Sequence, residues 1–134
     1  MANNIYPLAR EAFLSGAIDW TAGTIKAALI DKGTYTYSAA HQYWSSAVAS
    51  VIGTPTALTT RTATLGVADA DDVTFTGVSG ATVEALIIYK DTGSNSTSPL
   101  IAFIDDVSAG LPFTPNGGNV TVTWDSGSSR IFRL

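Results

Sequence analysis

The sequence predicts a single mainly-β domain in which antiparallel strands form a sandwich or a barrel. Short runs of alternating apolar and threonine residues recur along the chain, and Gly, Pro, Asn and Asp interrupt them at short intervals. The 134 residues match the length of one average domain, and they contain no linker and no internal repeat. We therefore expect one β-sandwich domain over residues 1–134, large enough to bury a core without a metal or a disulfide.

Two short helices are expected in the first third of the chain. Pro7 suits a first helical turn and Gly16 suits a C-terminal stop, which together predict an N-terminal helix over residues 6–15. Ser38 is a favourable N-cap residue, and it predicts a second short helix that ends near Val48.

The strongest strand is expected over residues 81–90, because apolar side chains occupy both of its faces. Ile87 and Tyr89 alternate on one face, and Leu86 and Ile88 alternate on the other. A strand of this kind is central in its sheet or covered on both sides. Further short strands are expected over residues 24–31, 56–58, 60–67, 71–75, 100–104, 119–124 and 130–134.

The composition indicates a protein whose surface contacts other protein molecules. Only 13% of the residues are charged, about half the usual fraction, while 46% are hydrophobic. Serine and threonine supply 31 of the 134 residues, so hydroxyl groups carry most of the surface polarity. The net charge of −4 and the scattered Lys and Arg residues argue against nucleic-acid binding, which needs a basic stripe.

The chain offers no signal for export or membrane insertion. Its first residues are polar, and no apolar run reaches the length of a signal core or of a membrane span. We therefore expect synthesis in the cytoplasm without export by the ordinary route. The absence of cysteine excludes thiolate metal sites, thiol catalysis and disulfides.

Catalysis is not expected, because the residues of a reaction centre cannot be assembled. His41 is the single histidine, and the segment 77–81 departs from the Gly-x-Ser-x-Gly pattern of a nucleophile elbow at its last position. Two acidic clusters, residues 69–72 and 105–106, could in principle bind calcium. Neither has the glycine and glutamate of a calcium-binding loop, so a role in turns is the preferred interpretation. We expect no enzyme, no metal and no cofactor.

The aromatic residues leave two interpretations open. Trp20, Trp44 and Trp124 could stack on sugars, or they could divide between the core and a protein interface. Trp124 lies on an alternating strand and is expected in the core.

Several segments resemble a widespread family of small structural proteins of tailed bacteriophages. The clearest are LPFTPNGG (111–118) and VTVTWD (120–125), and the likeness runs almost from end to end. The family resembles capsid decoration (cement) proteins with a jelly-roll-like fold, and it carries no catalytic or metal residues. Residues 43–54 depart from its pattern, since they are more aromatic and richer in alanine. The other resembling segments are NIYP (4–7), YTYSAAH (35–41), DADDVTF (69–75), EALIIYKDTG (84–93) and IFRL (131–134).

The resemblance implies a structural virion protein on the outer surface of a tailed-phage capsid. Its partners would be the major capsid protein and further copies of itself, as a dimer or trimer, with no nucleic-acid or membrane partner. Two alternatives stay open: another virion component, such as a tail or fibre module, and a carbohydrate-binding β-sandwich module. The expected interface residues, in the terminal arms and aromatic loops, are Ile5, Tyr6, Tyr43, Trp44, Phe113, Arg130 and Arg133.

Overall fold

The computed structural model describes residues 4–105, 111–124 and 131–133. These residues contain nine strands, one α-helix and three short 3-10 helices, labelled η. Every strand pairing among them is antiparallel, so the prediction of a mainly-β, antiparallel fold is confirmed. The elements are β1 (Asn4–Ile5), α1 (Pro7–Leu14), β2 (Thr24–Ile30), η1 (Trp44–Ser46), η2 (Val48–Ser50), β3 (Val51–Ala57), η3 (Thr64–Gly66), β4 (Val67–Ala68), β5 (Val73–Phe75), β6 (Ala85–Asp91), β7 (Leu100–Ile104), β8 (Val120–Val122) and β9 (Phe132–Arg133).

A five-stranded sheet with the order β1-β7-β6-β2-β3 forms the centre of the molecule. Strand β6 lies between β7 and β2, and its first five residues are buried on both faces. The expectation of a central, doubly covered strand is therefore confirmed, although the regular strand begins at Ala85 instead of residue 81. Strand β2 has the same character, since its last four residues are all buried.

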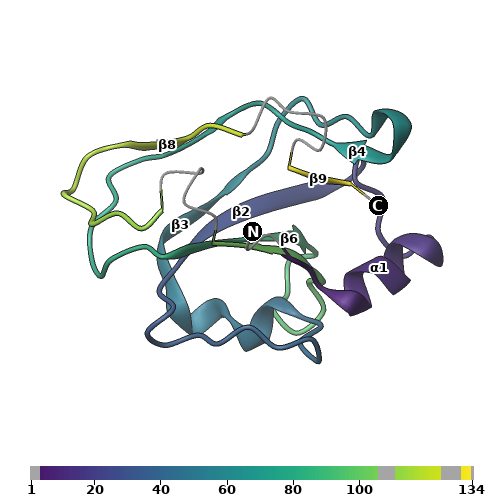
Figure 1. Ribbon diagram of the computed structural model, residues 1–134, viewed down its shortest axis with the longest axis horizontal. Helices are drawn as coiled ribbons and strands as arrows, with labels where there is room; N and C mark the ends of the chain where they lie inside the picture. The colour runs from purple at the N-terminus through teal and green to yellow at the C-terminus, as the bar shows by residue number, and fades with distance from the viewer. Residues whose placement is uncertain (1–3, 106–110, 125–130, 134) are drawn as a thin grey trace.

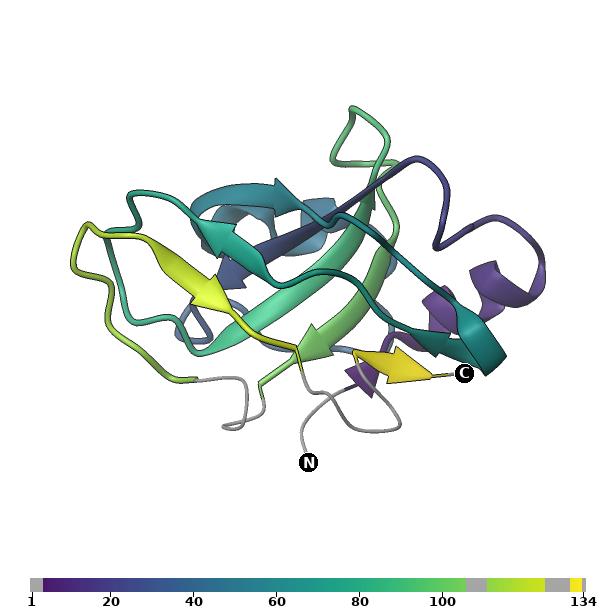
Figure 2. The same cartoon turned by 90° about the horizontal axis from the view of Figure 1, so that it is seen from above.

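The sheet is the middle of three layers (Figure 1). The strand pairs β4–β9 and β5–β8 lie over one face, and α1 with the turns η1 and η2 lies on the opposite side. Seen from above, the two pairs follow one another across the sheet as a broken antiparallel ribbon (Figure 2). Among the described residues, the strands of this ribbon form two separate two-stranded sheets, β4–β9 and β5–β8.

The edges of the central sheet are short or interrupted. Strand β1 has two residues, and β3 contains Gly53 and Pro55. The pairing between β2 and β3 also shifts register between Ala27 and Leu29. Both edges therefore offer few consecutive hydrogen-bonding groups in regular order.

The expected helix over residues 38–48 is wrong. Residues 39 and 40 form a turn, in which the backbone N–H of His41 donates to the carbonyl of Ser38. Tyr43 then makes an isolated bridge, and the two 3-10 turns η1 and η2 follow. The backbone N–H of Trp44 donates to the carbonyl of Ser98, and the N–H of Leu100 donates to the carbonyl of Gln42, each at 2.8 Å. These bonds to the β6–β7 hairpin take the backbone groups that a helix would use, so tertiary pairing overrides the local signal.

The expected strand over residues 60–67 is also wrong. Thr60 and Leu65 have φ angles of 53° and 55°, in the left-handed region that a strand does not use. An isolated bridge joins Thr62 to Asp69, and the chain then turns through η3. Threonine-rich composition alone therefore misled the prediction, because strand preference reflects packing on a sheet as well as residue type.

The predicted N-terminal helix and the burial of Trp124 are both confirmed. Helix α1 covers Pro7–Leu14. Trp124 is 8% exposed, and its indole N–H donates to the carbonyl of Asp71 at 3.0 Å. Its backbone N–H donates to Oδ1 of Asp72, also at 3.0 Å. The aspartates of this cluster thus tie the two chains of the ribbon together.

A chain of hydrogen bonds lies among the aromatic residues on the α1 side of the sheet. The hydroxyl groups of Tyr6 and Tyr35 are 2.7 Å apart, and the Tyr35 hydroxyl is 2.8 Å from Nδ1 of His41. The Tyr35 ring also packs on Phe103 of β7, with ring centroids 6.0 Å apart. The chain links the N-terminal segment to the loop before η1.

Buried tyrosines make the fold sensitive to alkali. Burial raises the pKa of Tyr6 and of Tyr35 above the ordinary value of 10.0, and burial together with the charge of Asp91 raises the pKa of Tyr89 to about 12. The folded state then holds protons that the unfolded state releases, so we expect the free energy of unfolding to fall as the pH rises above 10. Denaturant titrations at several pH values, followed by tyrosinate absorbance, measure this. Tyr89→Phe should flatten the decline, and an unchanged slope would contradict the assignment.

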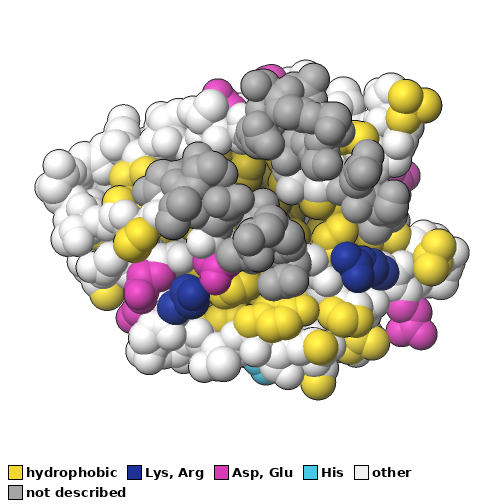
Figure 3. Space-filling view, viewed as in Figure 1, with side chains coloured by type: hydrophobic (Ala, Val, Ile, Leu, Met, Phe, Trp, Pro, Cys, Tyr) yellow, Lys and Arg dark blue, Asp and Glu magenta, His cyan; other side chains and the backbone are white. Residues whose placement is uncertain are grey.

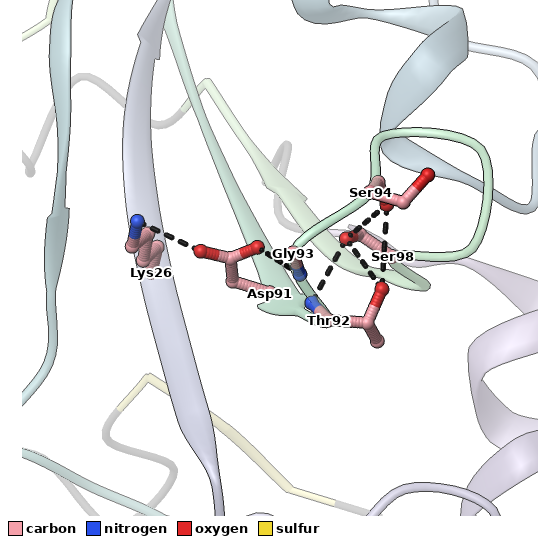
Figure 4. A network of polar contacts seen from close by, with 6 residues as sticks. All are labelled: Lys26, Asp91, Thr92, Gly93, Ser94 and Ser98. Atoms are coloured by element: carbon pink, nitrogen blue, oxygen red, sulfur yellow. Dashed lines mark hydrogen bonds and ion pairs between the residues drawn. The ribbon is translucent and has the colours of Figure 1, made fainter.

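The hairpin between β6 and β7 is closed by a polar network (Figure 4). Asp91 accepts a bond from the backbone N–H of Gly93 at 2.9 Å and forms an ion pair with Lys26 at 2.8 Å. These partners lower the pKa of the Asp91 carboxyl, the Lys26 contact being the largest cause. The loop thus begins with a fixed turn anchored to β2.

Ser98 holds the other side of this loop, and its removal is expected to loosen the hairpin. Its side chain is 1% exposed; Oγ donates to the carbonyl of Ser94 at 2.7 Å and accepts from the N–H of Thr92 at 3.0 Å. We expect Ser98→Ala to lower the free energy of unfolding by about 1–2 kcal/mol in denaturant titrations. Ser96→Ala, an exposed neighbour, is the matched control and should change it by less than about 0.5 kcal/mol. Equal effects of the two variants would contradict a structural role for Ser98.

Candidate interaction surface

Three of the expected interface residues lie in the core. Ile5, Tyr6 and Trp44 are 7%, 0% and 2% exposed. Tyr6 follows β1 and reaches the hydroxyl of Tyr35, while Trp44 stacks on Tyr89 with ring centroids 4.3 Å apart and an angle of 4°. Their side chains therefore offer no surface to a partner in this conformation, which corrects the expectation for these three.

The remaining expected residues lie in three different places. Tyr43 is half-buried and bridges to Pro99, and Phe113 is half-buried and bridges to Val83. The backbone of Arg133 pairs with β4, and Arg130 lies outside the described residues. The structure thus does not gather the expected residues into one patch.

His41 and the aspartates of the cluster 69–72 make hydrogen bonds within the chain. His41 contacts the Tyr35 hydroxyl through Nδ1, and Asp71 accepts a bond from the Thr60 hydroxyl at 2.7 Å. Asp72 accepts from the backbone of Trp124, and Asp69 accepts through its carbonyl from the indole of Trp20. Within the described part of the chain, no three His, Asp or Glu side chains are placed to hold a metal ion.

The tryptophans do not form a sugar-stacking platform. Trp20, Trp44 and Trp124 are 5%, 2% and 8% exposed, so none presents an open ring face. The indole N–H groups of Trp20 and Trp124 already donate to backbone carbonyls. Carbohydrate recognition by aromatic stacking therefore finds no support in these residues.

An apolar hollow of about 380 Å³ opens at the end of the molecule that holds the C-terminal end of α1. The end of α1, the segment 16–21, η3, β4 and β9 surround it. Trp20 and Phe132 meet edge to face there, with centroids 5.1 Å apart, and Phe13 lies 6.0 Å from Phe132. The wall is therefore mainly apolar, and three of its ten lining residues are aromatic.

Two leucines flank this hollow, and both project into solvent. Leu14 is 88% exposed and follows Phe13, while Leu65 is 97% exposed and precedes Gly66; Phe13 and Gly66 line the hollow. They are the large hydrophobic residues that are exposed within residues 4–105, 111–124 and 131–133. An aromatic hollow beside exposed leucines is the kind of apolar surface that marks a protein contact. We call Leu14, Leu65 and the hollow the leucine-flanked surface.

Leu65 is also held in an unfavourable backbone conformation. Its φ of 55° lies in the left-handed region, which costs a leucine roughly 1–2 kcal/mol. An exposure of 97% means that packing inside the chain does not offset this strain. Residues in strained backbone conformations cluster at functional positions.

Charge is sparse around the leucine-flanked surface. Asp19 lies at the hollow and accepts bonds from the hydroxyl and the backbone N–H of Thr21, which lower its pKa and keep it ionised. Arg61 donates to the carbonyl of Gly23 at 2.7 Å. The cations of Lys90 and Arg61 also lie near enough to lower the pKa of Asp19. Much of the described surface in Figure 3 is likewise neutral or hydrophobic, with isolated charged side chains.

The sequence concealed this surface for a physical reason. Leu65 follows an alternating threonine run and was assigned to a strand, and Leu14 belongs to a helix whose neighbouring apolar residues pack inward. A residue pattern reports that a side chain is apolar but does not report whether the fold covers it. A signal was present in the Leu65-Gly66 pair, since glycine is frequent where the chain takes positive φ.

No protein-family model matches this chain, and no curated protein matches it either. Within residues 4–105, 111–124 and 131–133, no helix combines the length and the apolar character that a membrane crossing requires.

Proposed function

We propose that this chain is a decoration (cement) protein of a tailed bacteriophage. It binds the outer surface of the capsid and stabilises the contacts between major capsid subunits. The resemblance of segments spread from residues 4–7 to 131–134 supports this proposal. Those segments include all of β6 and all of β8, so they coincide with strands that build the fold.

The observation that carries the proposal is the leucine-flanked surface. A protein that acts on small molecules needs convergent polar groups in its pocket. Here the hollow is mainly apolar with three aromatic residues, Leu14 and Leu65 nearby in the sequence are exposed, and Asp19 is the one charged residue among those that line it. These are the properties of a surface that binds protein, since interface cores are depleted of charge and enriched in aromatic residues.

The mechanism is adhesion to an assembled lattice. Packaged DNA pushes a capsid outward, and the seams between subunits are its weakest lines. A protein that binds only the assembled shell stabilises it by mass action, as any ligand of a native state does. Oligomers that match a local symmetry axis strengthen weak contacts through avidity.

We further propose that the layers form a jelly-roll-like sandwich. The position of β4–β9 and β5–β8 over one face of the five-stranded sheet supports this arrangement. In this arrangement the five-stranded sheet is one layer of the sandwich, and the ribbon of β4–β9 and β5–β8 is the second layer.

The test compares particles assembled with and without this chain, from the genome that encodes it. We expect the complete particles to carry hundreds of copies on the head, and particles without it to release DNA at lower temperature or after milder osmotic shock. Copies confined to the tail would favour a tail or fibre module instead. Equal resistance of both particles would overturn the cement function.

A further inference from the structure

We infer that Asn116 and Gly117 form a site of spontaneous covalent modification, at which the Asn116 side chain cyclises onto the backbone nitrogen of Gly117 and loses ammonia. The hydrogen bond from this nitrogen to the carbonyl of Val78 controls the rate, because cyclisation proceeds only when that bond opens. The reaction takes place within one chain and needs no partner, so it is independent of the proposed function.

The site lies in the exposed turn that leads into β8. Asn116, Gly117 and Gly118 are all exposed, so water and base reach the reacting atoms. Gly117 has no side chain to hinder the approach of its nitrogen to Cγ of Asn116. It also takes a φ of 89°, which glycine adopts readily, so the turn itself requires a residue without a side chain at this position.

The Asn116 side chain is already arranged as the electrophile. Its Oδ1 accepts a hydrogen bond from the backbone N–H of Gly118 at 3.0 Å. When a nucleophile attacks Cγ, negative charge builds up on Oδ1, and a donor fixed beside this atom stabilises that charge. The bond joins residues two positions apart within the turn, so it does not depend on the pairing with Val78.

The nucleophile is held back by the neighbouring chain. The Gly117 N–H donates to the carbonyl of Val78 at 2.7 Å, and the Val78 N–H donates to the carbonyl of Gly118 at 3.0 Å. The Gly77 N–H also donates to Oδ1 of Asn119 at 3.2 Å. These bonds extend the β5–β8 pairing towards the turn. Gly117 must leave the Val78 carbonyl and lose its proton before it attacks, so the reaction depends on local opening of the ribbon.

The reaction balances with water and base alone. Solvent base takes the proton of the Gly117 nitrogen, this nitrogen bonds to Cγ of Asn116, and the side-chain amide leaves as ammonia with a proton from water. Water then opens the cyclic imide at one of its two carbonyls. Opening at Cγ gives aspartate, and opening at the backbone carbonyl of residue 116 gives isoaspartate, in which the chain continues through Cγ. Either product adds one negative charge to the net charge of −4.

Isoaspartate at position 116 does not restore the original turn. Its backbone is longer by a methylene group, so Gly117 no longer meets Val78 in the same register when the turn closes. The modified chain therefore keeps this end of the ribbon open. Anion exchange separates it by its added negative charge, and the Val78 amide should then exchange its hydrogen faster than in the unmodified chain. Unchanged protection of this amide would overturn the expected effect on the ribbon.

Incubation of the full chain at mildly alkaline pH, both folded and in guanidinium chloride, tests the site and its control separately. Mass spectrometry of chymotryptic peptides measures the conversion of amide to acid at each asparagine. In the denatured chain, we expect Asn116 to convert faster than Asn95 and Asn119, which precede bulkier residues than glycine. In the folded chain, Asn116 should convert at least about tenfold more slowly. No excess at Asn116 in the denatured chain would overturn the site, and a folded rate as high as the denatured rate would overturn control by Val78.

A first variant identifies the reacting side chain. Asn116→Gln should convert far more slowly than the native chain, because its longer side chain must close a less favourable, larger ring. Conversion of the same peptide at the native rate in this variant would place the reaction at Asn119 and overturn the assignment to Asn116.

A second variant weakens the restraint without changing the reacting residues. Asn119→Ala removes the acceptor of the Gly77 N–H, so the folded chain should convert Asn116 about threefold faster or more, with the denatured rate unchanged. Asn95→Ala replaces an exposed asparagine in the β6–β7 loop and is the matched control, which should change neither rate. Equal folded rates in these two variants would show that opening of this pairing does not control the reaction.

Discussion

Replacing Trp44 with alanine is expected to destabilise the protein by about 3–5 kcal/mol, the largest effect of any change considered. Trp44 is 2% exposed, and its ring lies flat on Tyr89 of the central strand β6. Alanine would remove this stacking and leave a cavity between the sheet and the turn η1. Equilibrium unfolding in urea measures the loss of free energy.

Two further variants show whether burial of the Trp44 ring is the cause. Trp44→Phe keeps an aromatic ring over Tyr89 and should lose less than the alanine variant. Tyr43→Ala changes the half-buried neighbour and should cost much less than Trp44→Ala. If Trp44→Ala lost no more stability than Tyr43→Ala, the ring would not be part of the core, and a partner-binding role for Trp44 would return.

Tyr35→Phe is expected to cost about 1–3 kcal/mol, and more than Tyr6→Phe, although both remove the bond between these two hydroxyls. The hydroxyl of Tyr35 stands between Tyr6 and His41, at 2.7 and 2.8 Å. Tyr35→Phe leaves the Tyr6 hydroxyl buried without its partner, because Tyr6 is 0% exposed. Tyr6→Phe removes the buried hydroxyl itself, and Tyr35 keeps His41 as its partner.

Denaturant titrations of both single variants and of the double variant test this order. The double variant should be close in stability to Tyr35→Phe or slightly more stable, since removing the second hydroxyl relieves the unsatisfied group. A larger loss for Tyr6→Phe than for Tyr35→Phe would contradict the arrangement of the three side chains.

Local sequence patterns correctly predicted the elements in which tertiary contacts do not override the local conformational preference. Helix α1 and strands β2, β6 and β7 lie close to the ranges predicted from the spacing of apolar residues and from the turn-forming residues between them. In these elements the residues that favour the local structure also face the core. The segments 38–48 and 60–67 were misassigned for non-local reasons. Residues near Trp44 pair with a loop more than fifty positions later, and Leu65 has a φ that its residue type does not announce.

The candidate surface was harder to predict than the fold. Aromatic residues were expected at an interface, but the central sheet is covered on both faces and draws Tyr6 and Trp44 into its core. In the part of the chain that the structure describes, the large hydrophobic side chains that are exposed are instead Leu14 and Leu65. Which apolar residues stay uncovered depends on how the layers meet, and a single sequence does not record that.

The short and interrupted edges of the central sheet affect how the chain behaves when many copies are close together. If the chain is a decoration protein as proposed, many identical copies lie side by side on a shell, where exposed sheet edges could pair strand to strand and polymerise into fibres. Strand β1 ends after two residues, Pro55 gives β3 no N–H at one position, and the register shift beside β3 distorts the pairing. Under the proposed function, we therefore expect that crowding on a lattice does not lead to amyloid-like growth, and that side-chain contacts decide how neighbouring copies meet.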